Sequence, residues 1–425
     1  MRFLYTFLFY LLVPFILLRL LWRGIRAPAY WHRWHERFGF CPMLPIQPSL
    51  WIHAVSMGEV QAAVPLIQAL RHQLPEQPIL VTTMTPTGSQ RVREVFGDSV
   101  SHVYLPYDLP GAIARFLARS QPHWLILMET ELWPNLLCAC QLRGIGVILA
   151  NARLSANSAA GYQRIAGLMR PILENLTAVA AQTEVDAARF IDLGAPPTKV
   201  HVTGSIKFDT RLPNNFSEKT QQLRHQWGKD RAVWIAASTH EGEEVAVLDA
   251  FDELKKEFND LVLLLVPRHP ERFNRVAALC QRRGFMIARR SQGDVSTQTE
   301  IYLGDTMGEL PLLYAAGDVA FVGGTLVPIG GHNLLEPAAV GLPVIMGTHV
   351  FECAEICRRL LKAQAALQIN EAGQLPNAVK MYLSDMTLAR QTGENGRLFV
   401  EQNRGALECL LSVINEKFLV LEKKK

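Results

Sequence analysis

Acidic side chains follow two apolar runs in the first half of the sequence, where a reaction could use them. HAVSMGEV places Ser56, Gly58 and Glu59 after one run and at the start of a helical pattern. METELWPN places Glu129 and Glu131 after another run. A carboxylate in a first helical turn often serves only as a partner of the helix dipole, so position alone leaves the role of Glu59 open. Two adjacent carboxylates rarely serve packing alone, which favours a chemical role for this region.

Hydroxyl, amide and basic groups follow other runs in the same half. TMTPTG, from Thr83 to Gly88, offers hydroxyls and free N–H groups that suit an anionic ligand, although a plain Pro/Gly turn fits equally well. ANARLS contains Asn151 and Arg153 after a further run. GSIKFD contains Lys207, which could reach a leaving group held by a second domain, although an isolated lysine is usually a surface charge.

In the second half, basic and backbone groups predominate. LVLLLVPRHPERF delivers Arg268 and His269 after a fully apolar run, between Pro267 and Pro270, which restrict the turn and direct both groups to the sheet edge, so phosphate contact is their natural use. GDTMGELPLLY places Gly308, Glu309 and Leu310 at a helix start, whose N–H groups can hold a phosphate or a base edge. The acidic residues of STHEGEE are explained largely by helix capping.

Paired glycines mark the most informative segment, FVGGTLVPIGGHNLLEPAAVGLPVIMG. Glycines let the backbone approach a ligand closely, and a helix begins near Asn333, followed by Leu334, Leu335 and Glu336. The carboxylate of Glu336 can accept hydrogen bonds from ribose hydroxyls. His332 and Glu336 are four residues apart, but no third ligand is spaced nearby, so we expect no metal site.

Short apolar runs that alternate with helical patterns must position these groups, and this alternation is typical of parallel sheets covered by helices. In the first half the expected strands are Leu50–Ala54, Ile79–Thr82, His102–Leu105, Trp124–Met128, Gly146–Ala150, Ala178–Ala181 and Val200–Thr203. In the second half they are Val233–Ala236, Leu261–Val266, Phe285–Ala288, Ile301–Leu303, Val319–Val322 and Pro343–Met346. Ligands of such sheets lie beyond the carboxyl ends of the strands, where the chemical segments above also fall.

Two doubly wound, Rossmann-like α/β domains facing a cleft, as in GT-B glycosyltransferases, are therefore the expected fold, with an N-terminal anchor helix. The polar stretch PNNFSEKTQQ separates the two series of strands. The expected divisions are an anchor at 1–24, a first domain at 25–210, a linker at 211–230, a second domain at 231–390 and C-terminal helices at 391–425 that pack back on the first domain.

The N-terminus carries an uncharged run, FLYTFLFYLLVPFILL, whose length approaches the roughly 20 residues of a membrane-spanning helix. Arginines follow it at once, and the positive-inside rule then keeps the remaining chain in the cytoplasm. A signal peptide cleaved near Ala27, a buried helix and a helix lying in the membrane interface are the alternatives.

Composition excludes some classes of protein. The chain has 425 residues, of which 49% are hydrophobic and 19% charged, which is enough for two ordinary cores. A net charge of +4 is too small to indicate nucleic-acid binding without a basic and aromatic groove. Seven cysteines without a CxxC pair are expected to be free thiols in a reducing compartment.

Taken together, SMGEV, TMTPTG, METELWPN, NARLS, TGSIKFD, STHEGEE, VPRHPER, GDTMGEL and GGHNLLEPA resemble the 3-deoxy-D-manno-octulosonic acid (Kdo) transferases of lipopolysaccharide synthesis, over nearly the whole chain. The resemblance implies direct, inverting transfer of Kdo from CMP-Kdo to a lipid A precursor, lipid IVA, at the bacterial inner membrane. It implies no cofactor. A departing monophosphate gains less charge than a diphosphate, so side-chain cations could stabilise it without a metal.

The resemblance also assigns roles to residues. Glu59 would be the general base that deprotonates a glucosamine 6-hydroxyl, and Glu129 and Lys207 would stabilise the transition state. The CMP-binding residues would be Pro267, Arg268, Gly308, Glu309, Leu310, Asn333, Leu334, Leu335 and Glu336. Ser56, Gly58, Glu131 and Arg153 would lie near the acceptor or donor. Two alternatives remain: a nucleotide-sugar epimerase of the same fold, and a membrane-tethered binding module without catalysis.

Overall fold

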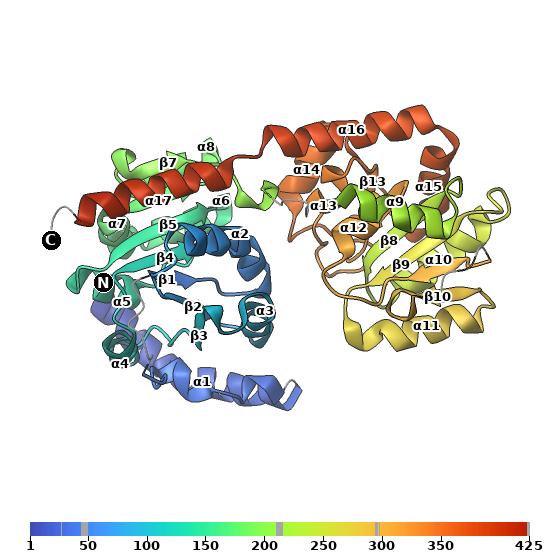
Figure 1. The fold of residues 1–425 in the computed structure, drawn as a ribbon. Coiled ribbons are helices and arrows are strands. Elements are labelled where there is room, and N and C mark those ends of the chain that lie inside the picture. The colour runs from blue at the N-terminus through green and yellow to red at the C-terminus, as the bar shows by residue number, and fades with distance from the viewer. Residues whose placement is uncertain (27, 44–49, 210–215, 294–295, 297, 423–425) are drawn as a thin grey trace. The chain divides into compact units, whose positions relative to one another are not determined.

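The chain forms two compact units in a computed structural model (Figure 1), which describes all residues except 27, 44–49, 210–215, 294–295, 297 and 423–425. The first unit comprises Met1–Asp209 and Arg404–Lys425, and the second comprises Thr210–Asn403. Residues 211–215 of the expected linker at 211–230 lie outside the described residues. Ala27, at the alternative signal-peptide cleavage site, also lies outside them.

The first unit is built on a parallel sheet of seven strands in the order β3-β2-β1-β4-β5-β6-β7. Its strands are short and most are buried on both faces, which is why they appear in the sequence as apolar runs without alternation. The strands are β1 (Leu50–His53), β2 (Ile79–Thr83), β3 (Ser101–Tyr104), β4 (Trp124–Met128), β5 (Gly146–Ala152), β6 (Ala178–Ala181) and β7 (Val200–Val202).

Helices cover both faces of this sheet (Figure 1), and two apolar cores fill the layers between them. The helices are α1 (Arg2–Arg26), α2 (Met57–Gln73), α3 (Pro86–Phe96), α4 (Pro110–Ser120), α5 (Pro134–Leu142), α6 (Ala156–Arg164), α7 (Ala166–Asn175), α8 (Glu184–Asp192) and, from the end of the chain, α17 (Ala406–Glu422). Because α17 completes one of the cores with Leu410 and Ile414, the first unit depends on residues from both ends of the sequence.

The second unit repeats the plan with a parallel sheet in the order β10-β11-β9-β8-β12-β13-β14. Its strands are β8 (Val233–Thr239), β9 (Val262–Pro267), β10 (Ile287–Arg289), β11 (Ile301–Leu303), β12 (Val319–Val322), β13 (Val344–Met346) and β14 (Ala366–Gln368). Its helices are α9 (Phe216–Trp227), α10 (Glu243–Leu254), α11 (Phe273–Arg282), α12 (Leu310–Ala315), α13 (Leu335–Ala339), α14 (Ala354–Lys362), α15 (Leu375–Ser384) and α16 (Met386–Gln402).

The C-terminal segment is divided between the units. The sequence predicts that residues 391–425 pack back on the first domain, but α16 packs against α13 and α15 and belongs to the second unit. Only the part from Arg404 onward lies in the first unit, where the Asp209 carboxylate accepts hydrogen bonds from the N–H groups of Gly405 and Leu407 at 2.7 and 2.6 Å.

In each sheet the strand order reverses beside the first strand. β1 lies between β2 and β4, and β8 lies between β9 and β12. Where the strand order reverses, the loops after the two neighbouring strands run to opposite sides of the sheet and leave a crevice between them. In open α/β sheets, ligands usually bind in this crevice, beyond the carboxyl ends of the strands. The segments that the sequence analysis selected after β1, β4, β8, β9 and β12 therefore fall at the expected edges.

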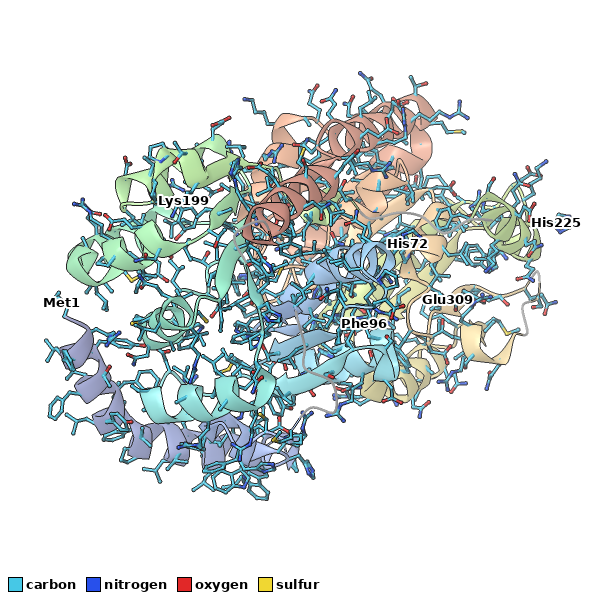
Figure 2. The ribbon with its side chains drawn as sticks, turned by 60° about the vertical axis from the view of Figure 1, so that its left-hand side comes forward. Met1, His72, Phe96, Lys199, His225 and Glu309 are labelled. Atoms are coloured by element: carbon cyan, nitrogen blue, oxygen red, sulfur yellow. The ribbon has the colours of Figure 1, made fainter. Side chains whose placement is uncertain are left out.

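Among the described residues, one helix, the N-terminal α1, is long and apolar enough to cross a membrane. A signal sequence would meet the same criterion. One side of α1 is held by the first unit, because Tyr5 donates to Asp108 and Thr6 to Asn135, each at 2.9 Å. Figure 2 labels Met1 at the start of α1 and shows many side chains projecting outward from it. The exposed ones are largely apolar: Phe3, Leu4, Phe7, Leu8, Tyr10, Leu11, Leu12, Phe15, Leu18, Leu21, Trp22 and Ile25.

Candidate active site

The first candidate catalytic group lies where β1 turns into α2. Ser56 caps α2, and its hydroxyl oxygen accepts from the N–H of Glu59 at 3.4 Å. In return, Glu59 Oε2 accepts from the N–H of Val55 at 2.9 Å and Oε1 accepts from the Ser56 hydroxyl at 3.2 Å. This reciprocal arrangement resembles a capping box, with Val55 rather than the cap residue Ser56 as the backbone donor, and it holds the half-buried carboxylate at the carboxyl edge of the sheet.

Burial raises the pKa of Glu59 to about 7. The carboxylates of Glu131 and Glu129 contribute to this rise in the pKa, and the hydrogen bonds from Val55 and Ser56 limit it. Glu59 forms no ion pair with any residue that the structure describes, so no cation offsets these effects. A carboxyl group that titrates near neutral pH can take up a proton and release it again, as a general base must.

Glu129 and Lys207 form an ion pair at the same edge, with Lys207 Nζ 2.8 Å from Glu129 Oε1. Glu129 directly follows β4 and has a φ of 56°, an uncommon left-handed conformation for a residue other than glycine. Asn151 is also left-handed, with a φ of 52°, and its buried side-chain oxygen accepts from the N–H of Ile206 at 3.2 Å. Asn151 thus supports the short turn that carries Lys207.

The other predicted residues of this unit lie around the ion pair in the loops after β4, β5 and β1. Glu131 accepts from the indole N–H of Trp133 at 2.9 Å, and burial raises its pKa. The hydroxyl of Thr130 donates to the carbonyl oxygen of Arg153, which joins the loop after β4 to the loop after β5. Gly58 is exposed in the first turn of α2.

In the second unit, Pro267 ends β9 and the N–H of Arg268 donates to the carbonyl oxygen of Thr239 at 3.0 Å, which joins the loops after β8 and β9. The half-buried Glu336 accepts from the Asn333 amide at 3.0 Å. Burial raises the pKa of Glu336, whereas Asn333 and the Arg268 cation lower it. These three polar groups are therefore close enough to act on one ligand.

Leu334 and Leu335 have buried side chains, so only their backbone is suited to contact a ligand. The N–H of Leu335 is already taken by the side-chain oxygen of Asn333 at 3.0 Å. The predicted contribution of these two residues therefore rests on the remaining backbone groups and on the placement of Asn333.

The Glu309 carboxylate has a partner in the structure, because Arg290 donates to both of its oxygens at 2.8 and 3.1 Å. This pair lowers the pKa of Glu309. Gly308 has a φ of 82°, and open space surrounds the position of a missing Cβ, while Leu310 packs against the core. The segment thus offers a ligand its backbone around Gly308 rather than a free carboxylate.

Sequence reasoning attributed the Glu243 carboxylate to capping, but the structure gives it a larger role. Glu243 is buried and accepts from four N–H groups at 2.8 to 3.1 Å, those of His240, Gly324, Thr325 and Leu326. It thereby fixes the paired-glycine loop after β12 to the start of α10. A contact between residues more than 80 positions apart leaves no signal in the local sequence pattern.

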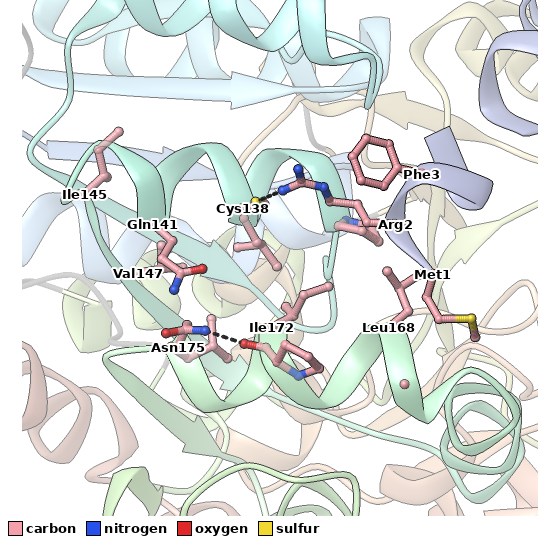
Figure 3. Close-up of a pocket in the computed structure, with 15 residues that line it drawn as sticks. Met1, Arg2, Phe3, Cys138, Gln141, Ile145, Val147, Leu168, Ile172 and Asn175 are labelled. Atoms are coloured by element: carbon pink, nitrogen blue, oxygen red, sulfur yellow. Dashed lines mark hydrogen bonds between the residues drawn. The ribbon is translucent and has the colours of Figure 1, made fainter. Parts of the chain in front are cut away.

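An apolar cavity of about 390 Å³ lies away from all these groups, between the start of α1 and helices α5 and α7 (Figure 3). None of the predicted site residues lines it. Figure 3 shows Met1, Arg2 and Phe3 of α1 along one side and the Arg2 guanidinium directed at Cys138. Within the described part of the chain, no group of three His, Cys, Asp or Glu side chains could hold a metal ion.

The chain is 44% identical to the 3-deoxy-D-manno-octulosonic acid transferase of Haemophilus influenzae over 420 aligned residues. The alignment covers 97% of this chain and 98% of that relative. This chain belongs to the Kdo transferase family. Residues 32–210 also match the family model of 3-deoxy-D-manno-octulosonic-acid transferase. The family prediction made from the ordered motifs is confirmed, and the protein is a glycosyltransferase that transfers Kdo.

Solved structures extend the comparison to the fold. A glycosyltransferase from Rickettsia africae is 14% identical and covers 88% of this Kdo transferase chain and 99% of its own, with a TM-score of 0.53. The UDP-GlcNAc 2-epimerase from Neisseria meningitidis bound to UDP-GlcNAc is also 14% identical, over 87% of this chain and 99% of its own, with a TM-score of 0.56. These likenesses confirm the GT-B type of fold, which both kinds of enzyme use.

Proposed function

We propose that this Kdo transferase uses CMP-Kdo as donor and a lipid A precursor, lipid IVA, as acceptor, and inverts the anomeric centre. The observation that carries the proposal is the half-buried Glu59 carboxyl, which Val55 and Ser56 hold at the carboxyl edge of the first sheet, where burial raises its pKa towards the neutral range that suits a base. A second sheet edge with Arg268, Glu336 and accessible backbone at Gly308 suits a nucleoside monophosphate.

In the proposed reaction, Glu59 accepts the proton of a glucosamine 6-hydroxyl while that oxygen attacks the anomeric carbon of Kdo. The new C–O bond forms as the bond from the anomeric carbon to the CMP phosphate oxygen breaks, and its electron pair leaves with CMP. Val55 and Ser56 orient the carboxylate throughout, because each holds one of its oxygens. Direct attack on the face opposite to CMP inverts the configuration.

Lys207 would stabilise charge on the reacting groups, with Glu129 holding its ammonium group in place at 2.8 Å. Arg268 would contact the phosphate of the departing CMP. A cation fixed beside developing negative charge can lower the barrier without reorganising during the reaction, so the proposed mechanism would use these two side chains and no metal.

The acceptor is embedded in a membrane, and we propose that α1 attaches the enzyme to the cytoplasmic face of the inner membrane. The exposed apolar side of α1 and the exposed Trp31 and Trp34 suit the interface of a bilayer. Not all of the following basic segment is available to lipids: Arg37 is buried and donates to the carbonyl oxygen of Met84 at 3.0 Å.

The test is an assay of the purified full-length protein with labelled CMP-Kdo and lipid IVA in mixed micelles. We expect labelled Kdo on the lipid and a count of the residues added. Conversion of UDP-GlcNAc without transfer would instead identify an epimerase. Binding of CMP-Kdo with no turnover on any lipid acceptor would leave only the tethered binding module.

A further inference from the structure

Three imidazoles gather beside Arg268 at the carboxyl edge of the second sheet. His240 follows β8, His269 follows β9, and His332 lies in the loop between β12 and α13. β8 lies between β9 and β12, so these three loops are neighbours at the point where the strand order reverses. None of the three histidines has a role in the function proposed above.

The imidazoles are in mutual contact. His240 Nε2 lies 2.7 Å from His332 Nε2, and the two rings stack at 5.0 Å between centroids with an interplanar angle of 11°. His269 meets His240 edge-on, at 5.3 Å and 79°. A hydrogen bond between two ring nitrogens requires one to donate and the other to accept, so at least one ring of the stacked pair is neutral.

The electrostatic surroundings of this histidine cluster, His240, His269 and His332, favour an added negative charge. Burial is the main cause that lowers the pKa of each histidine, and the Arg268 cation lowers all three further. Two carboxylates lie next to the cluster: that of Glu243, which is buried and already accepts from four N–H groups, and that of Glu271, which is exposed and 4.0 Å from His269. An oxyanion that entered would gain imidazole N–H donors beside a guanidinium.

The cluster is held in place by the fold. A Cβ on Gly324 would lie 3.0 Å from the His332 ring, so the paired-glycine loop packs directly on that ring. The same loop is bound to Glu243, which also accepts from the N–H of His240. One buried carboxylate therefore sets the positions of two of the three histidines, as expected of a preorganised subsite.

We propose that His240, His269 and His332, which lie beside Arg268, form the subsite for the carboxylate of the transferred sugar acid. This inference rests on the proposed function, because CMP-Kdo carries two anionic groups, the phosphate and the ulosonic carboxylate. One cation with the backbone around Gly308 serves the phosphate, and the carboxylate needs a second set of donors. A neutral sugar such as that of UDP-GlcNAc would not need it.

The test compares two constants for single variants, His332→Asn and His240→Asn: the KM for CMP-Kdo and the inhibition constant of CMP, which lacks the carboxylate. Hydrogen bonds to charged groups contribute roughly 1.5–3 kcal/mol, so we expect KM to rise about ten- to a hundredfold. The inhibition constant of CMP should stay within about twofold. The matched control is His225→Asn, on the exposed surface of α9 (Figure 2), which should change neither constant.

Other outcomes overturn the inference in distinguishable ways. Equal rises in KM and in the inhibition constant would assign the histidines to the phosphate, and no change in either would show that they bind no part of the donor. Wild-type protein without turnover of CMP-Kdo would refute the proposed function instead. Should either variant unfold in a thermal melt, His269→Asn, which removes a half-exposed ring, provides the same comparison.

Discussion

Glu59 is at once a structural cap and a candidate base, and the structure indicates how one residue can be both. A capping carboxylate near bulk water would keep an ordinary pKa and be ionised throughout the physiological range. Here burial and the carboxylates of Glu131 and Glu129 raise the pKa to about 7 despite two hydrogen bonds that favour ionisation. The cap positions the oxygen atoms, and the surroundings adjust their basicity.

Glu59→Gln separates these two roles. The amide oxygen of glutamine can still accept from Val55, so we expect the melting temperature and CMP binding to change little. The amide cannot accept a proton, so kcat should fall by about 10²–10⁴-fold. The matched control is Glu94→Gln on α3, whose carboxylate is exposed. Retention of most of the turnover in the assay with labelled CMP-Kdo would remove Glu59 from the mechanism.

The dependence of kcat/KM on pH provides an independent test of the same residue. A base is active when ionised, so the rate of the wild-type enzyme should rise with pH, reach half its plateau near pH 7 and stay level above. Glu131→Gln removes a neighbouring charge that raises the pKa of Glu59, and the midpoint should therefore move to lower pH. An unchanged or higher midpoint in that variant would contradict the assignment.

At the scale of elements, apolar runs predicted the sheets well because the parallel strands are buried on both faces. All thirteen expected strands are present within a few residues, and the fourteenth, β14, was missed. β14 has three half-buried residues at the edge of its sheet, so its sequence, Ala366 to Gln368, carries little apolar signal.

The candidate site was predictable to the extent that it consists of loops after strands. Glu129 and Arg268 follow apolar runs directly and Glu59 lies at the start of the helix after one, so parallel topology alone brings each to a carboxyl edge. The stacked contact of His240 with His332 was not predictable, because 92 residues separate them and only the folded loop brings them together. The partner of Glu309, Arg290, was missed for the same reason.

Glu243 is the residue that joins α10 to the paired-glycine loop, and Glu243→Gln tests that junction. One amide oxygen cannot replace two carboxylate oxygens that accept from four N–H groups, and the new NH₂ group would face donors. We expect the second unit to lose about 1–3 kcal/mol of unfolding free energy, measured by chemical denaturation, and KM for CMP-Kdo to rise.

The neighbouring Glu241 provides the control for this change, because its side chain is 67% exposed and pairs with an exposed arginine, Arg275. Glu241→Gln should leave stability within about 0.5 kcal/mol of wild type. Equal stability of the Glu243 and Glu241 variants would show that the loop does not depend on the buried carboxylate.

Helix α1 presents its apolar side outward while Tyr5 and Thr6 hold the other side to the first unit. Removing residues 1–22 should therefore release the protein from membranes in part at low salt, since exposed aromatic and basic groups after α1 remain, and fully at high salt, which screens their attraction to anionic lipids. Vesicle sedimentation measures both. Full retention at high salt would show that another surface anchors the enzyme.

At the scale of the whole molecule, the two units differ in how the chain builds them. The second unit is one continuous segment with its own cores. The first is completed by α17, whose Ala406, Leu410 and Ile414 are almost fully buried against its sheet and α2. The whole second unit therefore lies, in the sequence, between the two segments that form the core of the first unit.

Deleting residues 404–425 should consequently unfold one unit and spare the other. Loss of each buried leucine or isoleucine side chain costs about 2–5 kcal/mol of unfolding free energy. Removing the whole apolar face of α17 should therefore cost an amount comparable to the roughly 5–15 kcal/mol that stabilises a typical domain. Limited proteolysis should then leave a resistant fragment near Thr210–Asn403 that still binds CMP. Cys409→Ser, on the exposed side of α17, should leave both units resistant. Protection of the first unit in the truncated protein would mean that its fold does not require the returning helix.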